Sequence, residues 1–174
     1  MSSLLGANFR RDVEIHRYPL IVYALVPLSA LILQSWLPRA LGNWALIDLP
    51  LVITIYFALG RRSPIQGTLM GAALGLFEDA LTHHAIGLNG VAKAVVGYLA
   101  ASVGVRIDVD NAAIRVMLTF SLSLLSSAIF LFVARFMLGL EFDWRWTAEV
   151  IQAGANALLA LIFFPLMDRL QVRE

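Results

Sequence analysis

The sequence predicts an all-α integral membrane protein, a bundle of about six transmembrane helices with both termini in the cytoplasm. Hydrophobic residues make up 60% of the 174 residues, and charged residues make up only 14%. The mean hydropathy is +0.79. A soluble domain carries about 25% charged residues. Here the apolar residues form long continuous runs, which a surface facing water could not accommodate.

Six runs are long enough, or nearly long enough, to cross a bilayer as helices. They cover residues 20–37, 44–59, 64–81, 87–105, 114–138 and 147–167. About 20 helical residues span a hydrocarbon core of about 30 Å. Because the second run is short and the fifth is long, we expect local thinning at one and tilt at the other.

The runs leave room for one domain. We expect a cytoplasmic N-terminal segment at residues 1–18, a transmembrane domain at 19–168 and a cytoplasmic tail at 169–174. The first segment mixes apolar and charged residues, so an interfacial amphipathic helix and a disordered tail are both compatible with it.

Basic residues predict the orientation. One side of the predicted membrane carries nine of the thirteen lysines and arginines: Arg10, Arg11, Arg17, Arg61, Arg62, Arg106, Arg115, Arg169 and Arg173. The other side carries only Arg39 and Arg145. Cytoplasmic loops hold the excess of basic residues, so both termini are predicted inside.

The tryptophans fall at the predicted outer ends, where indole rings favour the headgroup layer: Trp36, Trp44, Trp144 and Trp146.

Composition also limits the possible functions. The net charge of +1 gives no reason to expect a nucleic-acid partner. The chain has no cysteine, which excludes disulfides and thiol chemistry.

Small residues predict close helix packing in the third run. Gly67, Gly71 and Gly75 follow one another at four-residue spacing and form a shallow groove. The groove could receive another helix of this bundle or a helix of a partner protein. The fourth run continues the pattern with Gly90, Ala94, Gly97, Ala101 and Gly104.

A polar cluster lies at the predicted outer end of the third and fourth runs. Glu78 and Asp79 end one run, and Lys93 lies about two turns into the next. Lys93 could extend outward and pair with Glu78 or Asp79 across the hairpin. Three further residues could join this cluster: Arg135, Gln152 and Asn156.

Three interpretations of this cluster remain open: a structural clasp, a surface for a partner or ligand, and a metal or catalytic centre. Asp79 and His83 are four residues apart and His84 is adjacent, but zinc needs at least three protein ligands in good geometry. No paired nucleophile and base, and no phosphate-binding loop, can be recognised. We therefore expect no enzymatic activity, no cofactor and no metal.

The stretch from residue 71 to residue 111 reads GAALGLFEDALTHHAIGLNGVAKAVVGYLAASVGVRIDVDN. It resembles the rod shape-determining protein MreD in its glycine-rich helix ending in Glu78 and Asp79 and in the following IGLNG at 86–90. The segments VGYLA at 96–100 and RIDVDN at 106–111 are also similar to members of this family.

The resemblance implies a non-enzymatic scaffold or regulator in the bacterial inner membrane, within the complex that elongates rod-shaped cells. Such a protein binds MreC and, through the complex, associates with MreB, RodA and a class B penicillin-binding protein. The implied fold is similar to the S-components of energy-coupling-factor transporters. The residues that this reading places at a partner contact, or directly supporting it, are Gly67, Gly71, Gly75, Glu78, Asp79, Asn89, Lys93 and Gly97.

An S-component-like protein that binds a vitamin-sized molecule is the alternative. Such a site needs aromatic and polar groups that converge on a pocket. Four residues could form one: Lys93, Trp144, Trp146 and Asn156.

Overall fold

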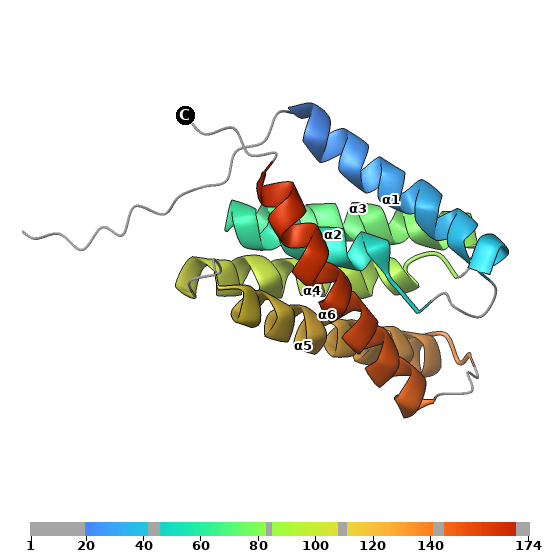
Figure 1. The fold of residues 1–174 in the computed structure, drawn as a ribbon. Coiled ribbons are helices and arrows are strands. Elements are labelled where there is room, and N and C mark those ends of the chain that lie inside the picture. Colours follow the sequence, from blue (N-terminus) through green and yellow to red (C-terminus); the bar gives the residue numbers. More distant parts are fainter. Residues whose placement is uncertain (1–19, 42–45, 83–84, 108–110, 141–144, 170–174) are drawn as a thin grey trace, which may run out of the picture.

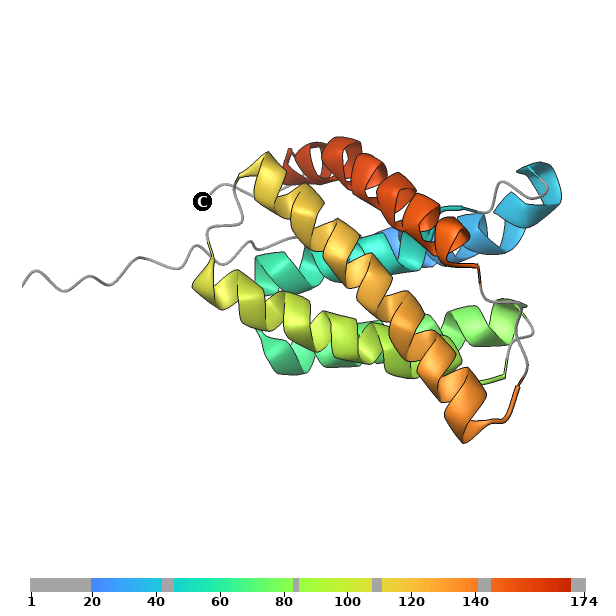
Figure 2. The same cartoon turned by 90° about the horizontal axis from the view of Figure 1, so that it is seen from below.

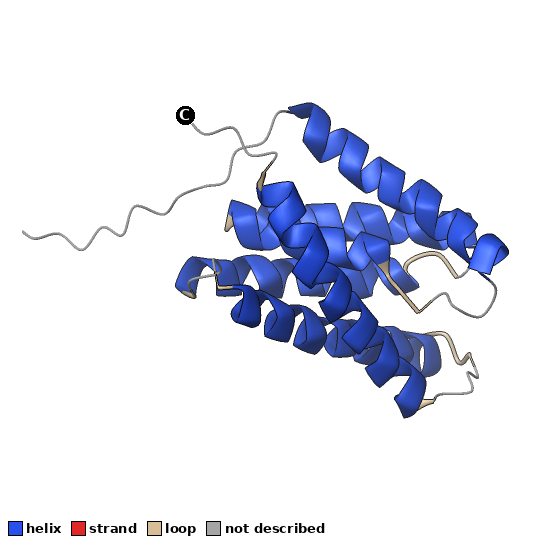
Figure 3. Cartoon of the chain, viewed as in Figure 1, coloured by secondary structure: helices blue, strands red, loops and turns tan. Residues whose placement is uncertain are grey.

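A computed structural model describes residues 20–41, 46–82, 85–107, 111–140 and 145–169. These residues form helices and short connections and contain no strand (Figures 1 and 3). The elements are α1 (Leu20–Leu41), α2 (Leu49–Arg61), α3 (Pro64–Thr82), α4 (Leu88–Arg106), α5 (Ala112–Phe132), the π-helix η2 (Val133–Met137) and α6 (Trp146–Asp168). The prediction of an all-helical chain is confirmed.

Local sequence explains where several helices begin and end. Asp48 precedes α2, and its carboxylate accepts a hydrogen bond from the backbone N–H of Leu51, with Pro50 in the first turn. Asn111 caps α5 in the same way through the N–H of Ala113. Arg62 ends α2 in the left-handed conformation. The chain therefore reverses direction at once into α3.

Helix α2 lies in the middle of the bundle (Figure 1) and contacts the other five α-helices. Its ten consecutive residues from Pro50 to Leu59 are all buried. At 13 residues, α2 is about 20 Å long, which is shorter than a hydrocarbon core of about 30 Å. The short second run is thus an enclosed central helix, and its start at Leu49 lies five residues after the predicted start.

The outside of the bundle is apolar. Among the described residues, three helical stretches are long and apolar enough to cross a membrane, namely Leu88–Arg106, Ala112–Met137 and Trp146–Asp168. Ile21–Trp36 and Leu49–Arg61 are apolar but shorter. Large side chains such as Ile65, Met117 and Ile162 are at least 70% exposed. This surface favours a membrane protein.

The ends of α3, α4 and α6 agree with the predicted runs to within one residue, whereas α1 ends four residues after its run. The fifth run is not a single α-helix. There, α5 changes at Val133 into the π-helix η2 (Figure 2, lower right). Several predicted features lie outside the described residues. These are segment 1–18, residues 170–174 of the tail, the two histidines His83 and His84, and the tryptophans Trp44 and Trp144. The two described tryptophans, Trp36 and Trp146, are both exposed.

Candidate functional site

The glycines of α3 pack directly against the backbone of α4. A Cβ atom on Gly67 would clash with the carbonyl oxygen of Gly97, and one on Gly71 would clash with that of Lys93. A Cβ atom on Gly75 would likewise clash with the carbonyl oxygen of Asn89. The interpretation of internal packing is therefore confirmed. The groove itself cannot receive a partner's helix, because α4 of the same chain fills it.

The close packing continues from α4 to α2. A Cβ atom on Gly104 would lie 2.7 Å from the carbonyl oxygen of Leu59, and one on Gly97 would also touch the Thr54 methyl group at 3.4 Å. Helices α2, α3 and α4 thus approach one another at the distance that only small residues permit.

The side chain of Lys93 is completely buried at the centre of a polar cluster. Its Nζ lies 2.6 Å from Glu78 Oε2, 2.8 Å from Asp48 Oδ2 and 3.3 Å from Asn89 Oδ1. The ammonium group is therefore surrounded by two carboxylates, which form ion pairs with it, and one amide oxygen. The predicted pairing of Lys93 with Glu78 is confirmed. The side chain extends toward the end of the bundle where α4 begins, as predicted, and there it meets Asn89 and Asp48. It is nevertheless 0% exposed and does not reach the surface.

Asp79 has a different role from the one predicted beside Lys93. Its carboxylate accepts hydrogen bonds from the backbone N–H groups of Gly87 (2.8 Å), Asn89 (3.1 Å) and Gly90 (3.3 Å). It also accepts one from the side-chain amide of Asn89 at 2.8 Å. A carboxylate at the start of a helix satisfies free N–H donors and complements the helix dipole. Asp79 therefore fixes the start of α4 rather than neutralising Lys93.

Asn89 joins these two arrangements. Its amide nitrogen donates to Asp79, and its amide oxygen lies within hydrogen-bonding distance of Lys93. Gly87, with a φ of +107°, makes the turn that brings Asn89 back toward α3. The IGLNG stretch thus forms a hairpin clasp between α3 and α4, as the structural interpretation of the cluster required.

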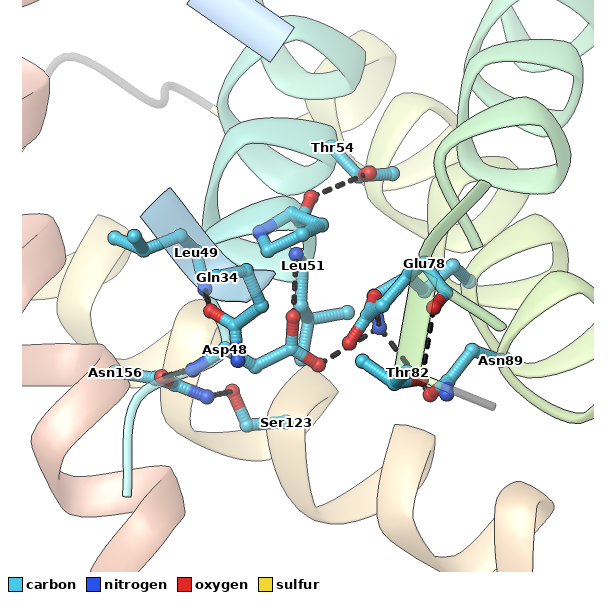
Figure 4. A network of polar contacts seen from close by, with 12 residues as sticks. Gln34, Asp48, Leu49, Leu51, Thr54, Glu78, Thr82, Asn89, Ser123 and Asn156 are labelled. Atoms are coloured by element: carbon cyan, nitrogen blue, oxygen red, sulfur yellow. Dashed lines mark hydrogen bonds and ion pairs between the residues drawn. The ribbon is translucent and has the colours of Figure 1, made fainter. Parts of the chain in front are cut away.

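Asp48 is the member of the cluster that sequence reasoning missed. One carboxylate oxygen caps α2, and the other pairs with Lys93 (Figure 4). The signal was present in the sequence, because an aspartate two residues before a proline is typical of a helix start. The predicted run from residue 44 places Asp48 inside a helix, where no capping role is expected for its side chain.

The backbone around Asp48 is also held by α1 and α6. The N–H of Asp48 donates to Asn156 Oδ1 at 2.9 Å, and the amide nitrogen of Asn156 donates to Ser123 Oγ at 3.2 Å. Gln34 donates to the carbonyl of Ile47 and accepts from the N–H of Leu49. The prediction that Asn156 joins the cluster is confirmed.

These residues form one buried polar network with at least one member on, or capping, each of the six α-helices. The members are Gln34, Asp48, Glu78, Asp79, Asn89, Lys93, Ser123 and Asn156. Figure 4 shows Asp48 between the Asn156 side and the Glu78 side. Buried ions cost several kcal/mol each unless they are well paired, so this network fixes how the helices fit together.

Other predicted residues are not part of the network. Arg135 is exposed on η2, and the side chain of Gln152 makes no hydrogen bond within the described part of the chain. The polar atoms of Lys93 and Asn156 are bonded to other residues of the network, whereas Trp146 is 66% exposed. The structure therefore does not bring these three residues together as a ligand pocket. Residues 20–41, 46–82, 85–107, 111–140 and 145–169 hold no group of three potential metal ligands.

A second polar contact ties the opposite end of the bundle. The Tyr56 hydroxyl donates to Asp168 Oδ1 at 2.8 Å, and Arg115 forms an ion pair with Asp168 Oδ2. These residues come from α2, α5 and α6. Sequence reasoning used Arg115 only for orientation and did not anticipate this contact.

Comparison with known proteins identifies no relative. No family model matches the chain, and neither a curated protein nor a solved structure matches it.

Proposed function

We propose that this protein is a membrane-embedded scaffold of the MreD type, with six spans and both termini in the cytoplasm of a bacterial cell. In this role it binds the transmembrane segment of MreC in the inner membrane. Through that contact it organises peptidoglycan synthesis during elongation, together with MreB, RodA and a class B penicillin-binding protein.

The buried polar network carries this proposal. A polar group within a membrane is costly and generally has a functional or structural purpose. Here Lys93, Asp79 and Asn156 are each 0% exposed and are bonded to other residues of the chain. Such an arrangement supports a fixed platform better than it supports a site that must open to a substrate.

The position of the sequence motifs gives further support. Glu78, Asp79 and the IGLNG stretch, which carry the resemblance to MreD, are the same residues that build the clasp between α3 and α4. Because α4 fills the glycine groove, Gly67, Gly71 and Gly75 support the partner surface from inside. The partner's helix then lies on the apolar exterior of the bundle.

A pull-down tests this function. The full chain with a C-terminal tag would be solubilised in detergent from native membranes, and its partners would be identified by mass spectrometry. Recovery of MreC or the elongation synthases is the expected result. Gly71→Leu should lose the partners, because the clash with α4 distorts the platform. Gly154→Leu is the matched control, because Gly154 has open space around its Cα.

Two results would contradict the proposal. Recovery of ATPase subunits with a T-component-like membrane protein would identify a transporter subunit instead. A rise in melting temperature with a member of a vitamin panel would point the same way, because a ligand that binds only the folded state stabilises it.

A further inference from the structure

A cavity of about 220 Å³ lies between α1, α2 and α3, away from the buried polar network. Its apolar walls come from Tyr23 on α1, Phe57 and Ala58 on α2, and Met70 on α3. The rings of Tyr23 and Phe57 pack against each other, with centroids 5.0 Å apart. The cavity is partly open, so a chain-like ligand could enter it without unfolding the bundle.

Arg61, at the end of α2, gives this cavity a cationic side. Its guanidinium lies 4.2 Å from the centroid of the Tyr23 ring, and its Nη1 donates to Gln66 Oε1 at 2.6 Å. A guanidinium has five N–H donors. Among the described residues, Gln66 is the only hydrogen-bond acceptor that Arg61 contacts. Within the described ranges, most of its donors therefore have no protein acceptor.

The next residue adds a second donor that lacks a partner. The Nε of Arg62 is buried and makes no hydrogen bond within the described part of the chain. Buried donors normally have an acceptor, and leaving one without an acceptor costs about 1–3 kcal/mol. Arg61 lines the apolar cavity, and the neighbouring Arg62 adds a second positive charge at the same turn. A guanidinium beside an apolar cavity is complementary to an anion that carries an apolar chain.

We propose that this cavity binds one anionic phospholipid. The phosphate lies on Arg61, and the first part of an acyl chain lies along Phe57 and Ala58 toward Met70, which is about 9 Å along α3 from its first residue. Arg61 lies at the end of the bundle predicted to face the cytoplasm, where the leaflet is rich in anionic lipids. The inference depends on membrane insertion and does not depend on the proposed partner.

Native mass spectrometry of the purified full chain in detergent tests this site. The probes are phosphatidylglycerol and phosphatidylcholine with identical acyl chains, and glycerol phosphate as a headgroup without chains. One phosphatidylglycerol should bind in preference to phosphatidylcholine. Arg61→Gln should weaken that binding on the order of fivefold or more. Arg106→Gln removes an exposed charge from the same predicted side and should leave the affinity unchanged.

A second variant keeps the test decisive if Arg61→Gln fails to fold. Met70→Trp leaves Arg61 in place and fills the apolar part of the cavity, so it should also abolish the preference for phosphatidylglycerol. Equal losses in Arg61→Gln and Arg106→Gln would show diffuse attraction to charge and overturn the site. Competition by glycerol phosphate at the same concentration as the lipid would identify a soluble phosphate ligand and overturn the lipid assignment.

Discussion

The ammonium of Lys93 lies 2.8 Å from the carboxylate of Asp48, and the same carboxylate caps the first turn of α2. One side chain therefore both starts a helix and neutralises a buried charge on another. The backbone N–H of Asp48 also donates to Asn156 on α6. A change at Lys93 should therefore alter the packing of α2, α4 and α6.

Replacing Lys93 with methionine should destabilise the protein by about 3–5 kcal/mol, because Asp48 and Glu78 would then be two buried carboxylates without a counter-ion. Thermal unfolding of the detergent-solubilised variant, followed by circular dichroism, measures the loss. Arg135→Met is the matched control, because Arg135 is exposed and belongs to no ion pair among the described residues.

Glu78→Gln should cost less than Lys93→Met, because Lys93 keeps its ion pair with Asp48. The triple variant Asp48→Asn, Glu78→Gln and Lys93→Met removes all three charges and should be more stable than Lys93→Met alone. If Lys93→Met had the same melting temperature as the wild type, the buried ion pairs would not stabilise the fold.

Much of this network could be predicted from the sequence, and the missing part has a physical reason. Lys93 and Glu78 are close in sequence across one hairpin, so helix geometry alone suggested their contact. Asp48 and Asn156 are 108 positions apart and meet only because α6 packs beside α2. The hydropathy pattern predicts the number of helices, but it does not predict which helices pack against each other.

The limits of helix assignment have a similar cause. Residues 44–59 form one apolar run, yet α2 begins at Leu49. The Asp48 side chain caps the helix there, so the capping residue rather than the apolar composition sets where the helix begins. The glycines of α3 were expected to pack against a helix, and only the folded chain shows that this helix is α4. A spacing pattern identifies a small-residue face without identifying what covers it.

Gly71→Ala should destabilise the bundle by about 1–3 kcal/mol, because the added methyl group would press on the backbone of α4 at Lys93. Gly154→Ala should be neutral or slightly stabilising, because it meets nothing within 4 Å and alanine favours helices over glycine. Comparing the two melting temperatures separates packing from helix propensity. Equal effects would mean that α3 and α4 do not approach so closely.

Asn156→Leu should destabilise the protein by about 1–3 kcal/mol, because the buried N–H of Asp48 would lose its acceptor. Gln152→Leu, one turn earlier on the same helix, is the control, since the Gln152 side chain makes no hydrogen bond within the described ranges. Urea or thermal unfolding of both variants in detergent measures the difference. A loss as large in Gln152→Leu would show that polarity at this part of α6 matters more than the bond to Asp48.

The predicted orientation can be tested cleanly, because the chain has no cysteine of its own. A single cysteine replacing Ile86, which is 76% exposed in the turn between α3 and α4, should react with a membrane-impermeant maleimide added to intact spheroplasts. A cysteine replacing Ser63, between α2 and α3, should react only after lysis, because Arg61 and Arg62 predict a cytoplasmic position for that turn. The opposite pattern would invert the topology. It would also place Arg61 in the outer leaflet, so the cavity beside it would meet a different set of lipids.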